Sequence, residues 1–130
     1  MRERSSDCGL DVALFVLGGK WKPIVLFHLQ TSPRRFGELK RLVEGISEKV
    51  LIQQLRELAE DGVITRMDFR EVPPRVEYSV TEFGSSLAMA LMPLCQWGQD
   101  NRQKISSMSR FKVAGKTTAS PKAEMDLVAQ

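Results

Sequence analysis

The hydrophobic period of residues 36–81 changes twice, and this constrains the fold more than any other feature of the 130-residue chain. Apolar side chains recur at helical spacing in residues 36–43 and again in residues 51–58, with Gly45 between the two runs. After Gly62 they alternate with polar side chains at a period of two. The pattern predicts two helices that are joined by a tight turn and followed by a β-hairpin.

The composition agrees with one globular domain. Hydrophobic residues make up 42% of the chain and charged residues 27%, which is typical of a soluble folded protein rather than a disordered one. The sequence contains no apolar run of about 18 residues, so we expect no membrane-spanning helix. Its N-terminal residues lack the apolar segment of a signal peptide. We therefore expect a cytoplasmic protein.

Charge is distributed unevenly along the chain. The formal net charge is only +3, but residues 19–50 contain seven basic and three acidic side chains. Residues 51–98 contain four basic and seven acidic side chains. This asymmetry is expected if one face of the domain meets a polyanion, although an ordinary surface of mixed charge would also explain it.

The residues that carry enzyme or metal chemistry are scarce. Cys8 and Cys95 are far apart and His28 is the only histidine, whereas a structural zinc site needs about four closely spaced ligands. His28 and Cys95 both lie on apolar helix faces, where packing roles are expected. No Ser/His/Asp set, glycine-rich phosphate loop or pair of carboxylates stands out. We expect no metal, no cofactor and no enzymatic activity.

The helix predicted over residues 47–61 can be assigned face by face. Ser47 is a good N-cap, because its hydroxyl can accept a hydrogen bond from an amide of the first turn. Leu51, Leu55 and Leu58 share one face at 100° per residue. Burial of each leucine stabilises the fold by about 1.5–3 kcal/mol, so this face turns inward.

The opposite face of this helix carries side chains that can bind DNA. Lys49, Gln53 and Arg56 point outward, with Ile52 beside them. Gln53 and Arg56 have the forked geometry that bidentate contacts to base edges require. Charge alone would favour a merely solvated face, but the preceding helix, the tight turn and the hairpin favour a helix that reads DNA.

The predicted hairpin pairs residues 63–69 with residues 75–80. Two prolines in its loop remove hydrogen-bond donors and discourage edge-to-edge pairing with other strands. Arg70 and Arg75 lie at the tip, where they can reach the sugar-phosphate backbone or a minor groove. The alternative is that they only make the tip soluble.

The two ends of the domain carry more apolar surface than a small domain can bury. Residues 10–17 form a short apolar helix, and Thr81 caps a long apolar helix near the C-terminus. Pairing with a second copy is the simplest explanation, and burial within the same domain is the alternative. The side chains expected at the dimer interface are Leu10, Leu14, Leu87, Leu91, Leu94 and Trp97.

Composition also sets the domain limits. Residues 1–7 are polar and predict a mobile arm, and residues 8–105 predict the folded domain. Residues 106–130 are of low complexity and predict a disordered tail.

Taken in order, these motifs resemble the HxlR-type winged helix-turn-helix transcriptional regulators, which are relatives of the MarR group. The resemblance covers about residues 8–98 and includes Cys8. The other segments on which the resemblance rests are GGKWK, RFGEL, GISEKVL, QLREL, DG, VPPRVEYSVT and WG. It implies a mainly α fold with a small β-hairpin wing, which dimerises through its N- and C-terminal helices.

The resemblance further implies a homodimer bound to double-stranded DNA at a roughly palindromic operator, and it favours a repressor. The recognition helices, residues 47–61 of each subunit, would enter successive major grooves about 34 Å apart. The expected contacts from this helix are Ser47, Lys49, Ile52, Gln53 and Arg56. The expected contacts to the DNA backbone, including those of the wing, are Lys20, Lys22, Lys40, Arg41, Arg70 and Arg75.

Cys8 matches the position of an N-terminal cysteine that several members of the family use to sense oxidants, quinones or other electrophiles. A sensing thiol needs thiolate character and access to its reactant. A packing role for Cys8 is the alternative. A regulator controlled by a non-covalent small-molecule ligand and a winged-helix module that binds protein instead of DNA also remain open.

Overall fold

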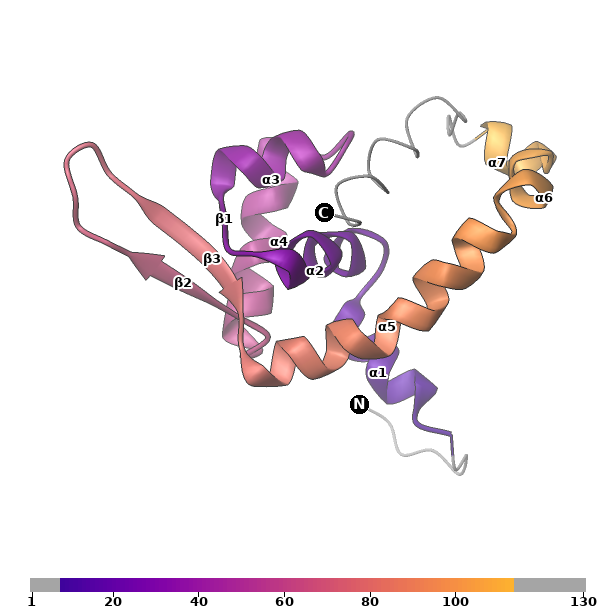
Figure 1. Ribbon diagram of the computed structural model, residues 1–130, viewed down its shortest axis with the longest axis horizontal. Coiled ribbons are helices and arrows are strands. Elements are labelled where there is room, and N and C mark those ends of the chain that lie inside the picture. Colours follow the sequence, from indigo (N-terminus) through magenta and orange to yellow (C-terminus); the bar gives the residue numbers. More distant parts are fainter. Residues whose placement is uncertain (1–7, 114–130) are drawn as a thin grey trace.

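Helices and a small sheet make up the structure, a computed structural model that describes residues 8–113 (Figure 1). The helices are α1 (Leu10–Leu17), α2 (Trp21–Thr31), α3 (Phe36–Leu42), α4 (Glu48–Glu60), α5 (Glu82–Asp100), α6 (Arg102–Ser106) and α7 (Ser109–Val113). The strands are β1 (Arg34–Arg35), β2 (Ile64–Asp68) and β3 (Val76–Val80). The predicted fold class, mainly α with a small β-hairpin, is confirmed.

The sheet is antiparallel, with the strand order β1-β3-β2. Its β2–β3 hairpin, in which Ile64 pairs with Val80, is the predicted one. β1 could not be predicted from the sequence, because a strand of two residues shows no period. The Nε of Arg34 in β1 donates to the carbonyl oxygen of His28, 3.2 Å away, and this bond holds the strand against the end of α2.

The two predicted N-caps are present and fix the ends of α4 and α5. The Ser47 hydroxyl accepts from the amide of Val50 at 3.1 Å. The Thr81 hydroxyl accepts from the amide of Gly84 at 2.9 Å and donates to the carbonyl oxygen of Gly62 at 2.6 Å. Thr81 therefore ties the start of α5 to the turn that ends α4.

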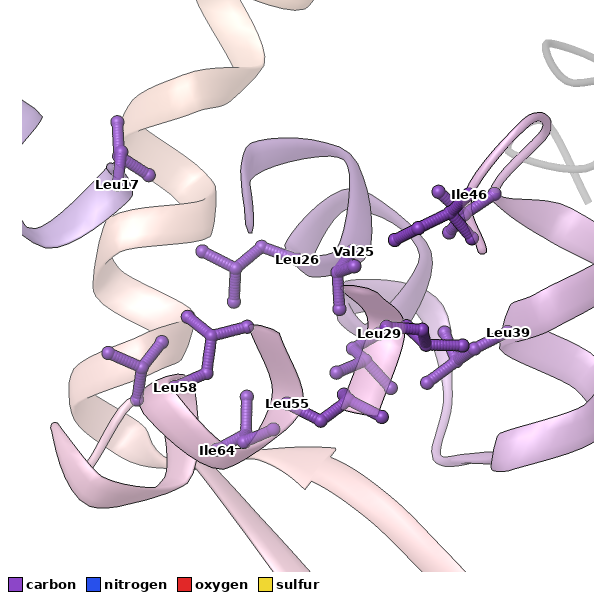
Figure 2. Packing of buried hydrophobic residues seen from close by; sticks show 12 residues of the cluster. Leu17, Val25, Leu26, Leu29, Leu39, Ile46, Leu55, Leu58 and Ile64 are labelled. Carbon is purple, nitrogen blue, oxygen red and sulfur yellow. The ribbon is translucent and has the colours of Figure 1, made fainter. Parts of the chain in front are cut away.

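The core lies between α2, α3, α4 and the base of β2 (Figure 2). Leu51, Leu55 and Leu58 are almost fully buried, as their shared face predicted. They meet apolar side chains from the neighbouring elements, which include Val25, Leu26, Leu29, Leu39 and Ile64. Because three leucines anchor α4, its opposite face is directed to solvent.

The hairpin and the C-terminal half of α5 extend from opposite sides of this helical body (Figure 1). The start of α5 is part of the body, where Ala88 is buried. Leu87 and Leu91 pack partly against the core, whereas Leu94 and Trp97 are exposed. The six residues predicted for a dimer interface therefore include two that already contact their own core.

The predicted boundary of the tail differs from the structure. Ser106 belongs to α6, and residues 109–113 form α7 rather than disordered chain. Phe111 is partly buried and its amide donates to the carbonyl oxygen of Met108 at 3.1 Å, so apolar contact and local hydrogen bonds extend the helical region. Residues 114–130, like the arm of residues 1–7, lie outside the described residues.

Within residues 8–113, no single helix has both the length and the apolar composition to cross a membrane. The pair formed by α1 and α2 meets that criterion on length and composition only, with a bend of 82° between the two helices.

Candidate nucleic-acid interface

The outer face of α4 presents a polar surface opposite the three buried leucines. Lys49, Gln53 and Arg56 are all exposed, and so is Ser47 at the start of the helix. Ile52 adds one apolar side chain that is 42% exposed. All five residues predicted for the recognition helix are thus accessible, four of them on α4 and Ser47 at its N-cap.

A side-chain cluster holds Gln53 on this surface. The Nε2 of Gln53 donates to Oε2 of Glu57 at 3.2 Å. The other oxygen of Glu57 accepts from Nζ of Lys22 in α2 at 2.5 Å. We call these three residues the Lys22–Glu57–Gln53 cluster; it links the first turn of α2 to the exposed face of α4.

The expected phosphate contact by Lys22 is corrected by this arrangement. The side chain of Lys22 is only 9% exposed and its ammonium group is bound by Glu57. The reason is that α2 packs against α4, where the side chain of Lys22 meets Glu57. A carboxylate on the facing helix could not be foreseen from the sequence of α2.

The electrostatics of the cluster favour an ionised Glu57. The hydrogen bond from Lys22 is the main cause that lowers the pKa of the Glu57 carboxyl from its ordinary value. The hydrogen bond from Gln53 lowers this pKa further. Glu57 is therefore a carboxylate at neutral pH, and a carboxylate can only accept hydrogen bonds.

Other basic side chains are exposed on the elements before and after α4. Lys20 lies just before α2, with its Nζ 4.3 Å from the ring centroid of Trp21, which packs partly against the core. Lys40 and Arg41 are exposed in the last turn of α3. These three were predicted as phosphate contacts, and their exposure is compatible with that role. Arg35 in β1 and Arg66 in β2 are also exposed, although neither was predicted as a DNA contact.

The two arginines of the hairpin tip differ in their surroundings. Arg70 is exposed, in a left-handed conformation with φ 54°, and its amide donates to Asp68 at 2.8 Å. The guanidinium carbon of Arg75 lies 3.6 Å from the ring centroid of Phe69, and one of its nitrogens lies 3.6 Å from Glu71. Arg75 thus contacts other side chains of the hairpin, whereas the side chain of Arg70 is exposed.

Both cysteines lie in the described part of the chain. Cys8 is exposed and precedes α1 by two residues. Cys95 is partly buried, with Nε2 of Gln99 at 3.8 Å from its sulfur. The packing role expected for Cys95 is therefore limited by its partial exposure, because the C-terminal half of α5 extends beyond the core of the protomer.

The ends of the domain leave an apolar surface uncovered. Leu10 and Leu14 of α1 are more than half exposed, and so are Leu94 and Trp97 of α5. Phe15 and Met89 are exposed on the same two helices. Patches of this kind on a small domain are typical of protein–protein contact sites.

Helix, turn, helix and hairpin together define the winged-helix class, in which one helix is held at the surface. Residues 16–106 match the family model described as the HxlR-like helix-turn-helix. The chain belongs to this family. It is therefore a transcriptional regulator of the HxlR and MarR type, and not an enzyme.

Individual relatives agree with this assignment. The uncharacterized HTH-type transcriptional regulator YkvN of Bacillus subtilis (strain 168) is 52% identical over 92 residues, which cover 71% of this chain and 78% of YkvN. The redox regulator HypR in its reduced form is 40% identical, with a TM-score of 0.71 over 78% of this chain and 100% of that one. A regulator assigned to the MarR family from Enterococcus faecalis V583 is 38% identical, with a TM-score of 0.66 over 83% of this chain and 100% of that one.

Proposed function

We propose that this regulator binds double-stranded DNA as a homodimer, with α4 of each copy in a major groove of a palindromic operator. One observation carries the proposal: three buried leucines fix α4 so that Lys49, Gln53 and Arg56 face solvent together. Gln53 and Arg56 are side-chain types that read base edges, and Lys49 can pair with a phosphate. Ser47 at the N-cap and Ile52 in the second turn of α4 are also exposed and complete the proposed set of contacts.

The backbone contacts come from exposed basic residues around α4. Lys20 lies just before α2, Lys40 and Arg41 lie in the last turn of α3, Arg70 lies at the tip of the hairpin, and all four are exposed. Arg75 has a structural role in the hairpin in addition to any contact that it makes. Contacts of this kind position the protein on DNA and carry no sequence information of their own.

The second copy covers the apolar surface of α1 and α5. Leu10, Leu14, Leu94 and Trp97 are exposed in the protomer, and Leu87 and Leu91 form the inner edge of that surface. A symmetric pair of protomers would bury these side chains and would present two α4 helices to one DNA duplex.

The proposal is tested by selecting binding sites from random DNA and measuring affinity for the selected operator. The variant Gln53→Ala/Arg56→Ala should lose about 1–3 kcal/mol for each bidentate contact that it removes. The matched control Gln103→Ala/Lys104→Ala changes one amide and one cation at exposed positions of α6 and should bind like the wild type. Equal binding by both variants would exclude α4 as the reading element.

We further propose that Cys8 is an oxidant or electrophile sensor. Its thiol is exposed ahead of α1, and HypR, which is 40% identical, is described as a redox regulator. Modification of Cys8 would shift the adjacent helix α1, which belongs to the proposed dimer interface. The change in the dimer would then alter its affinity for the operator. We infer that the regulator is a repressor and that the oxidant lowers its affinity for the operator.

The role of Cys8 is measured by a gel shift with and without diamide. Diamide should change operator affinity in the wild type and in Cys95→Ser, and it should have no effect on Cys8→Ser. If mass spectrometry shows Cys8 to be modified while operator affinity stays the same, Cys8 is not the sensor.

A further inference from the structure

The Lys22–Glu57–Gln53 cluster is built more firmly than a surface ion pair. Nζ of Lys22 lies 3.2 Å from the position that a Cβ would occupy at Gly18, the residue that ends α1. Gly18 has φ 56°, so both its conformation and the space above it favour glycine. The Lys22 side chain therefore passes over the backbone of Gly18, where no side chain blocks it, and reaches Glu57. Only 9% of the Lys22 side chain is exposed.

The position of Glu57 is well defined because it pairs with the buried ammonium group of Lys22. Removal of a buried charge's partner is strongly unfavourable, so Lys22 retains Glu57 as its counter-charge. Glu57 contacts Lys22 with one carboxylate oxygen, and the other oxygen is left for Gln53. The cluster thus connects the end of α1, the start of α2 and the outer face of α4.

The carboxylate also fixes which end of the Gln53 amide faces Glu57. An ionised carboxylate only accepts, so the amide nitrogen must face it and the amide oxygen must face away. One N–H of Gln53 remains for another acceptor. The remaining N–H and the oxygen are the donor and acceptor that a glutamine needs to bind N7 and N6 of adenine.

We propose that Glu57 is a positioning residue: held by Lys22, it orients the amide of Gln53 so that Gln53 reads an adenine in the operator. This inference rests on the proposed function, because it requires that α4 enters the major groove. Glu57 itself need not touch the DNA. If the contact between Gln53 and Glu57 were only a helix-stabilising pair at i and i+4, base preference would not depend on it.

The test compares base preference rather than total affinity. The variant Lys22→Met/Glu57→Ala removes one positive and one negative charge, so the net charge is unchanged and no buried cation lacks a partner. Affinity is measured for the selected operator with each of the four base pairs at every position. The wild type should prefer A·T at one position in each half-site by about 5- to 150-fold, and Gln53→Ala should lose this preference.

In the double variant, preference at that same position should fall to less than about threefold while the other positions keep theirs. Combined with Gln53→Ala, the double change should remove no further preference, as expected for residues that act through one another. Glu60→Ala removes an exposed carboxylate one turn further along α4 and should retain the preference.

Glu57→Gln provides a second variant that keeps the side-chain volume. Its amide oxygen can still accept from Lys22, but its nitrogen then faces Gln53 and forces that amide to turn. The preference for adenine should again be lost. If both cluster variants fold and keep the wild-type preference, the inference is wrong and DNA binding still stands. If the wild type selects no sequence at all, the proposed function fails, and this inference fails with it.

Discussion

Single residues show where this fold tolerates no change. A Cβ added at Gly84 would lie 1.9 Å from the carbonyl oxygen of Val63, which is closer than real Cβ atoms approach backbone atoms. Gly84 therefore allows the first turn of α5 to pack directly on the backbone of Val63, which connects α4 to β2. The sequence motif around Thr81 predicted the start of this helix, but the close approach at Gly84 became visible only in three dimensions.

Gly84→Ala should lower the free energy of unfolding by about 1–3 kcal/mol, because α5 must shift away from Val63. Gly98→Ala is the matched control within the same helix. Apart from the neighbouring residues and the backbone of the helix itself, no atom lies within 4 Å of a Cβ at Gly98, so its alanine should leave stability unchanged or raise it by up to about 1 kcal/mol. Urea denaturation of both variants measures the difference; equal stabilities would contradict the close packing at Gly84.

At the scale of elements, the sequence predicted those features that depend on residue type and spacing within a short segment. The leucine face of α4, the caps at Ser47 and Thr81, and the hairpin all follow from spacing and residue type. Two features did not follow from it. β1 is too short to have a period, and the burial of Lys22 depends on Glu57, which lies 35 residues away in the chain. Apart from β1 and α7, the features that sequence reasoning missed were contacts between distant elements rather than the elements themselves.

The elements around α4 give a prediction on salt dependence. If Lys40 and Arg41 of α3 bind phosphates, Lys40→Ala/Arg41→Ala should weaken binding equally for specific and random DNA. It should also reduce the slope of log affinity against log salt by about one for each lost contact. Titrations at several salt concentrations measure this slope. A wild type whose binding does not depend on salt would instead indicate a module that binds protein.

The proposed function uses two regions of the molecule, which we call the working regions. The hairpin and α4 belong to one region, and α1 with the C-terminal half of α5 belongs to the other (Figure 1). The sequence predicted the excess of apolar surface at the two ends. It could not show that Leu87 and Leu91 lean on the core while Leu94 and Trp97 do not, because that division depends on where α5 leaves the body.

The variant Leu94→Glu/Trp97→Glu should convert a dimer to a monomer, because it places charges on the apolar surface of α5. Both side chains are exposed in the protomer, so the helical circular dichroism should persist. Val72→Glu, at a fully exposed position of the wing, should leave the mass unchanged. Sedimentation equilibrium gives the mass; a wild-type monomer would refute the proposed interface.

The spacing of half-sites in the selected operator tests the central claim most directly, because it depends on both working regions together. Two α4 helices in one dimer should select a palindrome whose half-site centres lie about 34 Å apart, which is about one turn of the duplex. Gln53→Ala/Arg56→Ala should lose that motif. A single unpaired half-site, or no enriched sequence, would contradict the account of a dimeric regulator that reads DNA with α4.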